Sequence, residues 1–340
     1  PMPPTPREIL KQLLQGIHPP KPLFLPIIFN LGAKIENTPL PAYLTNPTKI
    51  TNAQRQIRTR LRSDGVSCYF DPNLEAEALG ATIEWPTSDE PPKQHWPNNP
   101  KKGELPNNPR TPEEAANHPR VKVAVEVIQR LKSLLRDEPL LQAGISGPFT
   151  LAAQLTQQFG RESINRNDLP DTAVELAAAT VIQVATKLAE AGAHIIFIHE
   201  EILPTLTPQT AEAWASKLAP AINIIRFYQA LPVLQITNHQ AFAENSVAIS
   251  QQTWDCVLCP TLPAEPNATF LHARTETTPP LGIAIPTAAF QSEDHSAQNF
   301  RQSLHTIIGD MHPVLITTAQ DVPATTDLKQ LSNLSEEIHR

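Results

Sequence analysis

The sequence predicts a single-domain (β/α)8 barrel of the TIM type that spans all 340 residues. Short apolar runs alternate with longer amphipathic segments, which is the pattern of an α/β protein with a parallel sheet. Eight apolar runs of strand length occur along the chain. Several end in acidic or polar residues, and barrel enzymes carry their active sites at the carboxyl ends of the strands.

The expected elements follow one another in a regular order. The first apolar run is bounded by prolines, which mark its two ends as turns. We expect strands at residues 23–29, 66–70, 140–145, 194–199, 233–237, 256–259, 281–285 and 313–317. We expect helices at residues 6–17, 47–63, 121–136, 173–191, 209–231, 297–309 and 327–338.

An irregular insertion interrupts this rhythm at about residues 86–112, which are rich in Pro, Asn and Lys and show no periodicity. Long segments of this kind are usually mobile spacers or lids. The composition favours a disordered spacer, whereas a lid over the barrel mouth would need an apolar anchor. Trp96 is a candidate for that anchor.

Composition narrows the class of protein. A hydrophobic content of 40% and a net charge of −7 give no reason to expect binding to nucleic acid or to an anionic membrane. No apolar run approaches the roughly 20 residues that span a bilayer. The first residues lack the pattern of a secretory signal, and three cysteines fit a reducing compartment, so we expect a cytoplasmic protein.

Three motifs suggest a family. They read F-D-P-N-L-E-A-E-A-L-G-A at residues 70–81, G-P-F-T-L at 147–151 and D-V-P-A-T-T-D at 321–327. In this order and spacing they resemble the uroporphyrinogen decarboxylase superfamily. The resemblance implies a barrel, a small-molecule substrate and the option of a homodimer.

Asp71 is the leading catalytic candidate. It follows an expected strand, and a carboxylate there can point into the barrel mouth. In the decarboxylase, the matching aspartate binds the pyrrole N–H groups of the substrate and stabilises the protonated intermediate. The alternative is an Asx turn, since Asp-Pro commonly begins one. Glu75 and Glu77 follow in the first turn of a helix, where acidic side chains favour the helix dipole.

Other decarboxylase positions differ here. The stretch equivalent to its arginine-bearing segment reads F-N-L-G-A and places Asn30 where the substrate's carboxylates would be held. Beside Phe149, Gln154 occupies the position of the family tyrosine, and Glu201 approximately that of the serine. A substrate with many carboxylates needs cations to offset desolvation, so these changes disfavour uroporphyrinogen itself.

The methyltransferases of the superfamily bind zinc through an H-x-C and a later G-C motif. The resemblance places Gln235, Thr237 and Gln320 at those three ligand positions. An amide or hydroxyl is a poor zinc ligand, so we expect no metal. A separate C-x-x-C at Cys256 and Cys259 lies in an expected strand, where the two side chains point to opposite faces and favour a core role.

An acidic pair follows the strand at residues 194–199. His199, Glu200 and Glu201 stand at the catalytic end of a barrel strand and could act as acid, base or clamp for a cationic group. The alternative is a cap for the next helix. His239 is a similar but weaker candidate, and a stripe of arginines at residues 55–62 reads as the solvated face of an outer helix.

Three functions remain open. The first is metal-independent and cofactor-free decarboxylation of a tetrapyrrole-type or related carboxylated substrate. We expect it to use catalytic Asp71, Glu200 and Glu201. The expected substrate-binding residues are Asn30, Phe149, Gln154, His199, Gln235, His239 and Gln320. The second is a corrinoid or thiol methyltransferase with a rebuilt metal site, and the third a non-catalytic ligand-binding barrel. Fold resemblance alone does not choose among them.

Overall fold

The structure is a computed structural model. It describes residues 3–87, 90–98, 100–136, 139–158, 169–260, 279–290 and 295–339, without the side chains of residues 288 and 295–302.

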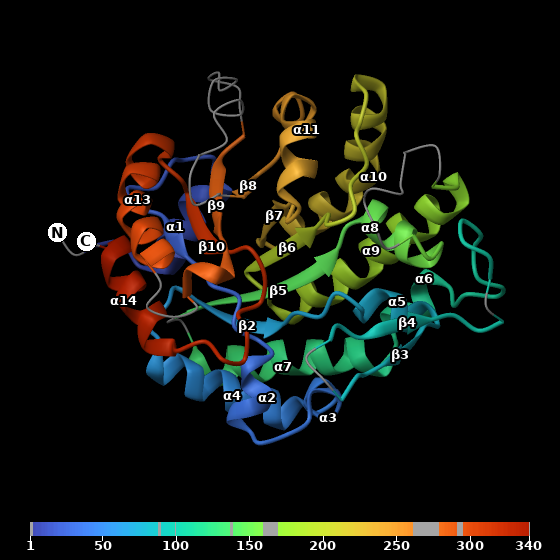
Figure 1. Cartoon of the computed structure of the whole chain (residues 1–340), viewed down its shortest axis with the longest axis horizontal. Coiled ribbons are helices and arrows are strands. Elements are labelled where there is room, and N and C mark those ends of the chain that lie inside the picture. Colours follow the sequence, from blue (N-terminus) through green and yellow to red (C-terminus); the bar gives the residue numbers. More distant parts are fainter. Residues whose placement is uncertain are drawn as a thin grey trace.

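One parallel sheet forms the centre of the protein, and helices surround it (Figure 1). Its strand order is β1-β10-β9-β8-β7-β6-β5-β2, so neighbours along the chain are neighbours in the sheet apart from β1 and β2. This is the predicted barrel, and the expected fold class is confirmed. The strands are β1 (Leu23–Phe24), β2 (Gly65–Tyr69), β5 (Leu140–Ser146), β6 (Ile195–His199), β7 (Leu231–Gln235), β8 (Val257–Pro260), β9 (Leu281–Ile285) and β10 (Leu315–Thr318).

The seam between β1 and β2 has no strand ladder. It is closed by Asp64, whose backbone N–H donates to the carbonyl of Phe24 at 2.9 Å while its carboxylate accepts the Phe24 N–H at 2.7 Å. His339 in helix α14 (Leu328–His339) reaches the same carboxylate at 3.0 Å. The strand expected at residues 23–29 is shorter than predicted and covers only Leu23–Phe24. Pro26 has no backbone N–H to donate, so the hydrogen bonding to β10 ends there.

The outer helices bury one apolar face against the strands. They include α1 (Pro6–Leu14), α4 (Pro47–Arg60), α7 (Pro119–Leu135), α9 (Asp171–Ala191), α10 (Pro208–Phe227), α11 (His239–Ser250), α13 (His295–Met311) and α14. Shorter helices lie at the strand ends: α2 (Leu31–Ile35), α3 (Leu40–Leu44), α5 (Leu74–Leu79), α6 (Pro112–Ala116) and α8 (Pro148–Leu155). Arg55 and Arg62 are exposed, as expected for an outer stripe.

The insertion is more ordered than its composition predicts. Strand β4 (Lys93–His95) pairs antiparallel with β3 (Thr82–Glu84) in a hairpin. Trp96 is only 3% exposed, and its indole N–H donates to the carbonyl of Gln154 at 3.1 Å. The expectation of a disordered spacer is therefore wrong for this part of the chain, because one buried aromatic side chain fixes the hairpin to α8.

Within the described residues, α9 is long and apolar enough to cross a membrane by length and composition. Just over half of its most apolar window, 56%, is buried inside the protein. A core helix passes the same test, so this is weak evidence for a membrane span.

Candidate functional site

An inner cavity of about 330 Å³ opens at the carboxyl ends of the barrel strands. Its lining includes five of the predicted site residues, Asn30, Asp71, His199, Glu201 and Gln320, which come from four separate segments. No lysine or arginine lies among the lining residues that the structure describes. The predicted residues Phe149, Glu200, Gln235 and His239 do not line it.

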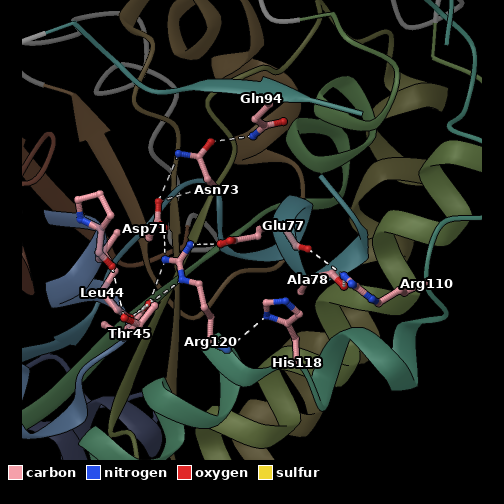
Figure 2. A network of polar contacts seen from close by, with 12 residues as sticks. Leu44, Thr45, Asp71, Asn73, Glu77, Ala78, Gln94, Arg110, His118 and Arg120 are labelled. Carbon is pink, nitrogen blue, oxygen red and sulfur yellow. Dashed lines mark hydrogen bonds and ion pairs between the residues drawn. The ribbon is translucent and has the colours of Figure 1, made fainter. Parts of the chain in front are cut away.

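Asp71 is part of a buried ion pair that the sequence did not reveal. The guanidinium of Arg120, in α7, contacts the Asp71 carboxylate and also Glu77 (Figure 2). The hydroxyl of Tyr69 accepts two further hydrogen bonds from Arg120, at 3.0 and 3.2 Å. The other oxygen of Asp71 accepts the backbone N–H of Asn73 at 3.0 Å, which is the Asx turn of the alternative interpretation. Asp71 thus faces the cavity already paired with a cation, which it shares with Glu77.

Glu75 contacts the backbone of the cavity wall at the end of β5. It is fully buried, and one of its oxygens accepts the backbone N–H of Ser146 at 3.1 Å, while the other has no partner. Burial, reinforced by the nearby charge of Asp71, raises the pKa of Glu75 to about 7. The helix-dipole interpretation of Glu75 is incomplete, because the side chain also joins α5 to the end of β5.

His199 lies in the cavity wall as a neutral imidazole. Burial lowers its pKa to about 4, and its ring stacks on Phe197 at a centroid distance of 6.1 Å. Gly144 leaves the space for it, since a Cβ there would lie 2.9 Å from His199 Nε2. Among the described residues no side chain or backbone group hydrogen-bonds the ring. His199 is therefore free to accept a proton from a bound molecule.

The acidic pair after β6 separates into two roles. Glu201 lines the cavity, where partial desolvation raises the pKa of its carboxyl group. Glu200 is fully buried and points the other way. Its carboxylate accepts the backbone N–H of Thr150 at 3.0 Å and the indole N–H of Trp214 at 2.6 Å, at the N-terminus of α8. This geometry does not support the predicted catalytic role of Glu200, because the side chain caps a helix and does not line the cavity.

Asp321 is a lining residue that sequence reasoning did not place in the site, although it begins the third motif. Its carboxylate accepts the backbone N–H groups of Phe29 and Asn30, each at 2.8 Å, and so holds the turn before α2. Burial raises its pKa to about 7. The motif itself was the signal that could have indicated it.

The positions that correspond to the zinc ligands of the related methyltransferases do not fit a metal. Gln235 is fully buried, and its amide nitrogen donates to the carbonyls of Thr318 and Ala319 at 3.2 and 3.1 Å, which joins β7 to the end of β10 across the barrel. Thr237 and Gln320 line the cavity. The described residues contain no group of three His, Cys, Asp or Glu side chains that could hold a metal ion. Cys256 and Cys259 are buried and form no disulfide, as expected for core residues.

A second, outer cavity of about 730 Å³ shares Asn30, Asp71 and Glu201 with the inner one. The β3–β4 hairpin forms its far wall, and Gln154 lines it from α8. Phe149 is in the core and donates its backbone N–H to Glu200, and His239 lies outside both linings. The predictions that Phe149, Gln235 and His239 contact a substrate are therefore not supported by the geometry of these two cavities.

The barrel with a polar cavity at its mouth places the protein in the (β/α)8 class of folds. The family model "Uroporphyrinogen decarboxylase (URO-D)" matches residues 5–243. The chain belongs to this family, and the family resemblance is confirmed; the first two motifs lie within the matched residues and the third, at residues 321–327, lies beyond them.

Relatives and solved structures refine the comparison. Two sequences named methylcobamide:CoM methyltransferase MtaA, both from Methanosarcina barkeri, are 26% identical over 138 and 157 residues. These matches cover 39% and 44% of this chain and 40% and 45% of the relatives, so the chain matches less than half of their length. A methyltransferase from Methanosarcina mazei has the same fold, with a TM-score of 0.78 at 17% identity over 99% of both chains. A B12-independent methionine synthase from Shewanella sp. W3-18-1 gives a TM-score of 0.56 at 13% identity, covering 88% of this chain and 87% of that one.

Proposed function

We propose that this chain is an enzyme that transfers a methyl group between small molecules that are neutral or cationic. The observation that carries the proposal is the lining of the inner cavity. It contains Glu201, Asp71 paired with Arg120, and a neutral His199, with no cationic side chain among the described lining residues. Such a wall repels a polyanion and attracts a cation. The curated relatives named above are methyltransferases, and the sequence similarity supports this branch of the family.

Methyl transfer places modest demands on the protein. An acceptor X–H attacks the methyl carbon, the bond from that carbon to the donor breaks, and the donor leaves with the electron pair. The acceptor's proton must go to a base. We assign the proton to His199, which has no protein partner among the described residues. Burial lowers its pKa to about 4 and makes it a weak base in the empty cavity, so the scheme relies on Glu201, in the same lining, to stabilise the imidazolium that forms. Phe70 and Pro72 add apolar surface that limits access of water.

Zinc, which activates the thiol in methyltransferases of this superfamily, has no counterpart in this scheme. Gln235, Thr237 and Gln320 offer an amide, a hydroxyl and an amide, and the amide nitrogen of Gln235 is already used in a hydrogen bond across the barrel. These residues do not fit a zinc site. Acceptor activation is instead assigned to His199.

The test combines a methyl donor with two acceptors of different charge. Purified protein is incubated with methylcobalamin and either cysteamine, a cationic thiol, or 2-mercaptoethanesulfonate, an anionic one, and the loss of the methylcobalamin spectrum is followed. We expect faster turnover with the cationic thiol and a fall of about 10²-fold or more in His199→Asn. Turnover only with the anionic thiol would contradict the charge argument, and unchanged turnover in His199→Asn would contradict the assigned base.

Decarboxylation of a substrate with few carboxylates is the second candidate, because Asp71 lies at the mouth in the position that the decarboxylase resemblance implies. Anaerobic incubation with uroporphyrinogen, with product carboxylates counted by chromatography, tests it. Conversion that disappears in Asp71→Asn would favour this candidate over methyl transfer. If both assays are negative, a non-catalytic ligand-binding barrel is the remaining hypothesis. A cytoplasmic location and a homodimer remain predictions.

A further inference from the structure

The outer cavity is lined by two amide side chains whose oxygens have no hydrogen-bond partner. Gln94 lies on the hairpin strand β4 and Gln154 on α8, and both line the cavity. The Oε1 atoms of Gln94 and Gln154 are buried and unpaired. A buried acceptor without a donor is costly, and such groups commonly mark a place where a ligand binds.

The orientation of Gln94 follows from the ion pair beneath it (Figure 2). Asp71 is held by Arg120 and accepts a hydrogen bond from the amide nitrogen of Asn73 at 3.4 Å. The amide oxygen of Asn73 therefore points outward, where it accepts the amide nitrogen of Gln94 at 2.7 Å. Since each amide has one donating and one accepting end, the oxygen of Gln94 is the group left over.

Gln154 is fixed in the same sense. Its amide nitrogen donates to the carbonyl of Pro72 at 3.0 Å. A rotation of the amide would place two oxygens against each other, so the remaining group is again an acceptor. Gln154 is 7% exposed, which leaves little water to satisfy it.

We propose that the outer cavity is a substrate subsite for a neutral group that carries N–H donors, such as a carboxamide or an amino-substituted ring. Both oxygens are covered in the empty cavity, and a turn of each side chain would bring them to the cavity surface, where they could accept hydrogens from one such group. Trp85 and Pro92 supply apolar surface for a flat ring. The proposal rests on the proposed function only in assigning this subsite to the substrate whose reacting group occupies the inner cavity.

A binding experiment tests the subsite without turnover. The full chain is titrated with nicotinamide, which carries two amide hydrogens, and with methyl nicotinate, a neutral analogue of similar size that carries none. Tryptophan fluorescence reports binding because Trp85 lines the cavity. We expect saturable quenching by nicotinamide and an affinity for methyl nicotinate that is lower by roughly tenfold or more.

Variants localise the effect. Gln154→Met and Gln94→Met each remove one acceptor, and each should remove most of the preference for nicotinamide. Gln56→Met is the matched control, since Gln56 is exposed on α4 and bonds Glu36 far from the cavity. Gln94 lies on a surface hairpin, so Gln94→Met remains informative if Gln154→Met fails to fold. Equal affinity for the two probes, no saturable binding of nicotinamide, or a preference unchanged in Gln94→Met would each overturn the proposal. None of these outcomes depends on methyl transfer.

Discussion

Arg120 and Asp71 form an ion pair whose side chains are only 6% and 5% exposed, at the wall that separates the barrel mouth from helix α7. Asp71 and Glu77 raise the pKa of Arg120 further above its usual value, although burial opposes the charge. The guanidinium therefore stays charged behind the cavity wall, where the carboxylates of Asp71 and Glu77 both offset its positive charge. It also fixes the direction of the hydrogen bonds that run outward through Asn73 to Gln94 (Figure 2).

Removal of this cation should be strongly destabilising. Arg120→Met leaves Asp71 and Glu77 without their counter-charge, and we expect a loss of about 3–5 kcal/mol in the free energy of unfolding. Urea denaturation followed by circular dichroism measures the loss. Arg130→Met is the control, because Arg130 makes an exposed pair with Glu126 that is worth about 0.5 kcal/mol or less. Equal losses of unfolding free energy in the two variants would show that the buried Arg120 pair is no more stabilising than an exposed one.

Glu75 should make the protein less stable as pH rises. Its pKa is about 7 in the folded state and near 4.5 when exposed, so between these values the folded state holds a proton that the unfolded state has lost. The contribution of Glu75 to the free energy of unfolding is therefore greatest below about pH 4.5 and declines as the pH rises to about 7. Glu75→Gln mimics the protonated form, and we expect it to stabilise the protein at pH 8 by on the order of 2–3 kcal/mol.

The melting temperature measured from pH 5 to pH 8 checks this expectation. Glu75→Gln should flatten the profile, whereas Glu113→Gln, on the exposed face of α6, should leave it unchanged. Glu200 and Asp321, with pKa values raised to about 7 by burial, contribute slopes of the same sign and remain in both variants. A Glu75→Gln profile as steep as that of the wild type would contradict the raised pKa.

Trp96 should hold the insertion against the barrel. Trp96→Ala removes a buried indole and its hydrogen bond to Gln154, for which we expect a loss of about 3–5 kcal/mol. The hairpin is the part directly released, so limited proteolysis should cut within residues 86–112 before any other site. Phe227→Ala, at a side chain 73% exposed, should alter neither stability nor the cleavage pattern. First cleavage elsewhere in Trp96→Ala would argue against the anchor.

The missing zinc site should be recoverable by substitution. Gln235 already reaches the end of β10 across the barrel, which shows that the two ligand-bearing strands are close enough to share an ion. We expect the triple variant Gln235→His, Thr237→Cys and Gln320→Cys to retain about one zinc per chain after dialysis. The wild-type protein and Gln320→Cys alone should retain none. A folded triple variant without zinc would show that the positions are misaligned.

The fold could be predicted from the sequence because each buried strand appears as a short apolar run. Each of the eight expected apolar runs contains or overlaps a strand of the sheet, and the boundaries shift by a few residues, as at β7. Burial of parallel strands on both faces makes them continuous apolar runs, which a single sequence displays directly. The β3–β4 hairpin was missed because its stability depends on Trp96, one residue in an otherwise polar segment.

The functional site was harder to predict from the sequence, because its contacts join residues that lie far apart along the chain. The partner of Asp71 is Arg120, and nothing local connects an arginine early in α7 to a strand end that precedes it by many residues. Glu200 and Glu201 are adjacent in sequence but point in opposite directions, and which one faces the cavity depends on α8 and Trp214. Positions at strand ends were predictable, whereas side-chain partners required the packing of distant elements.

The unladdered seam between β1 and β2 has a consequence for biosynthesis. Strand β1 pairs with β10, so a chain emerging from the ribosome displays β1 long before its partner exists. Asp64 can join β1 to β2 early, but the other edge of β1 and the edge of β9 stay unpaired until β10 is made. Such edges are templates for wrong pairing. Closure of the ring is therefore a late event, and a nascent chain of this protein is expected to need protection from its neighbours until that moment.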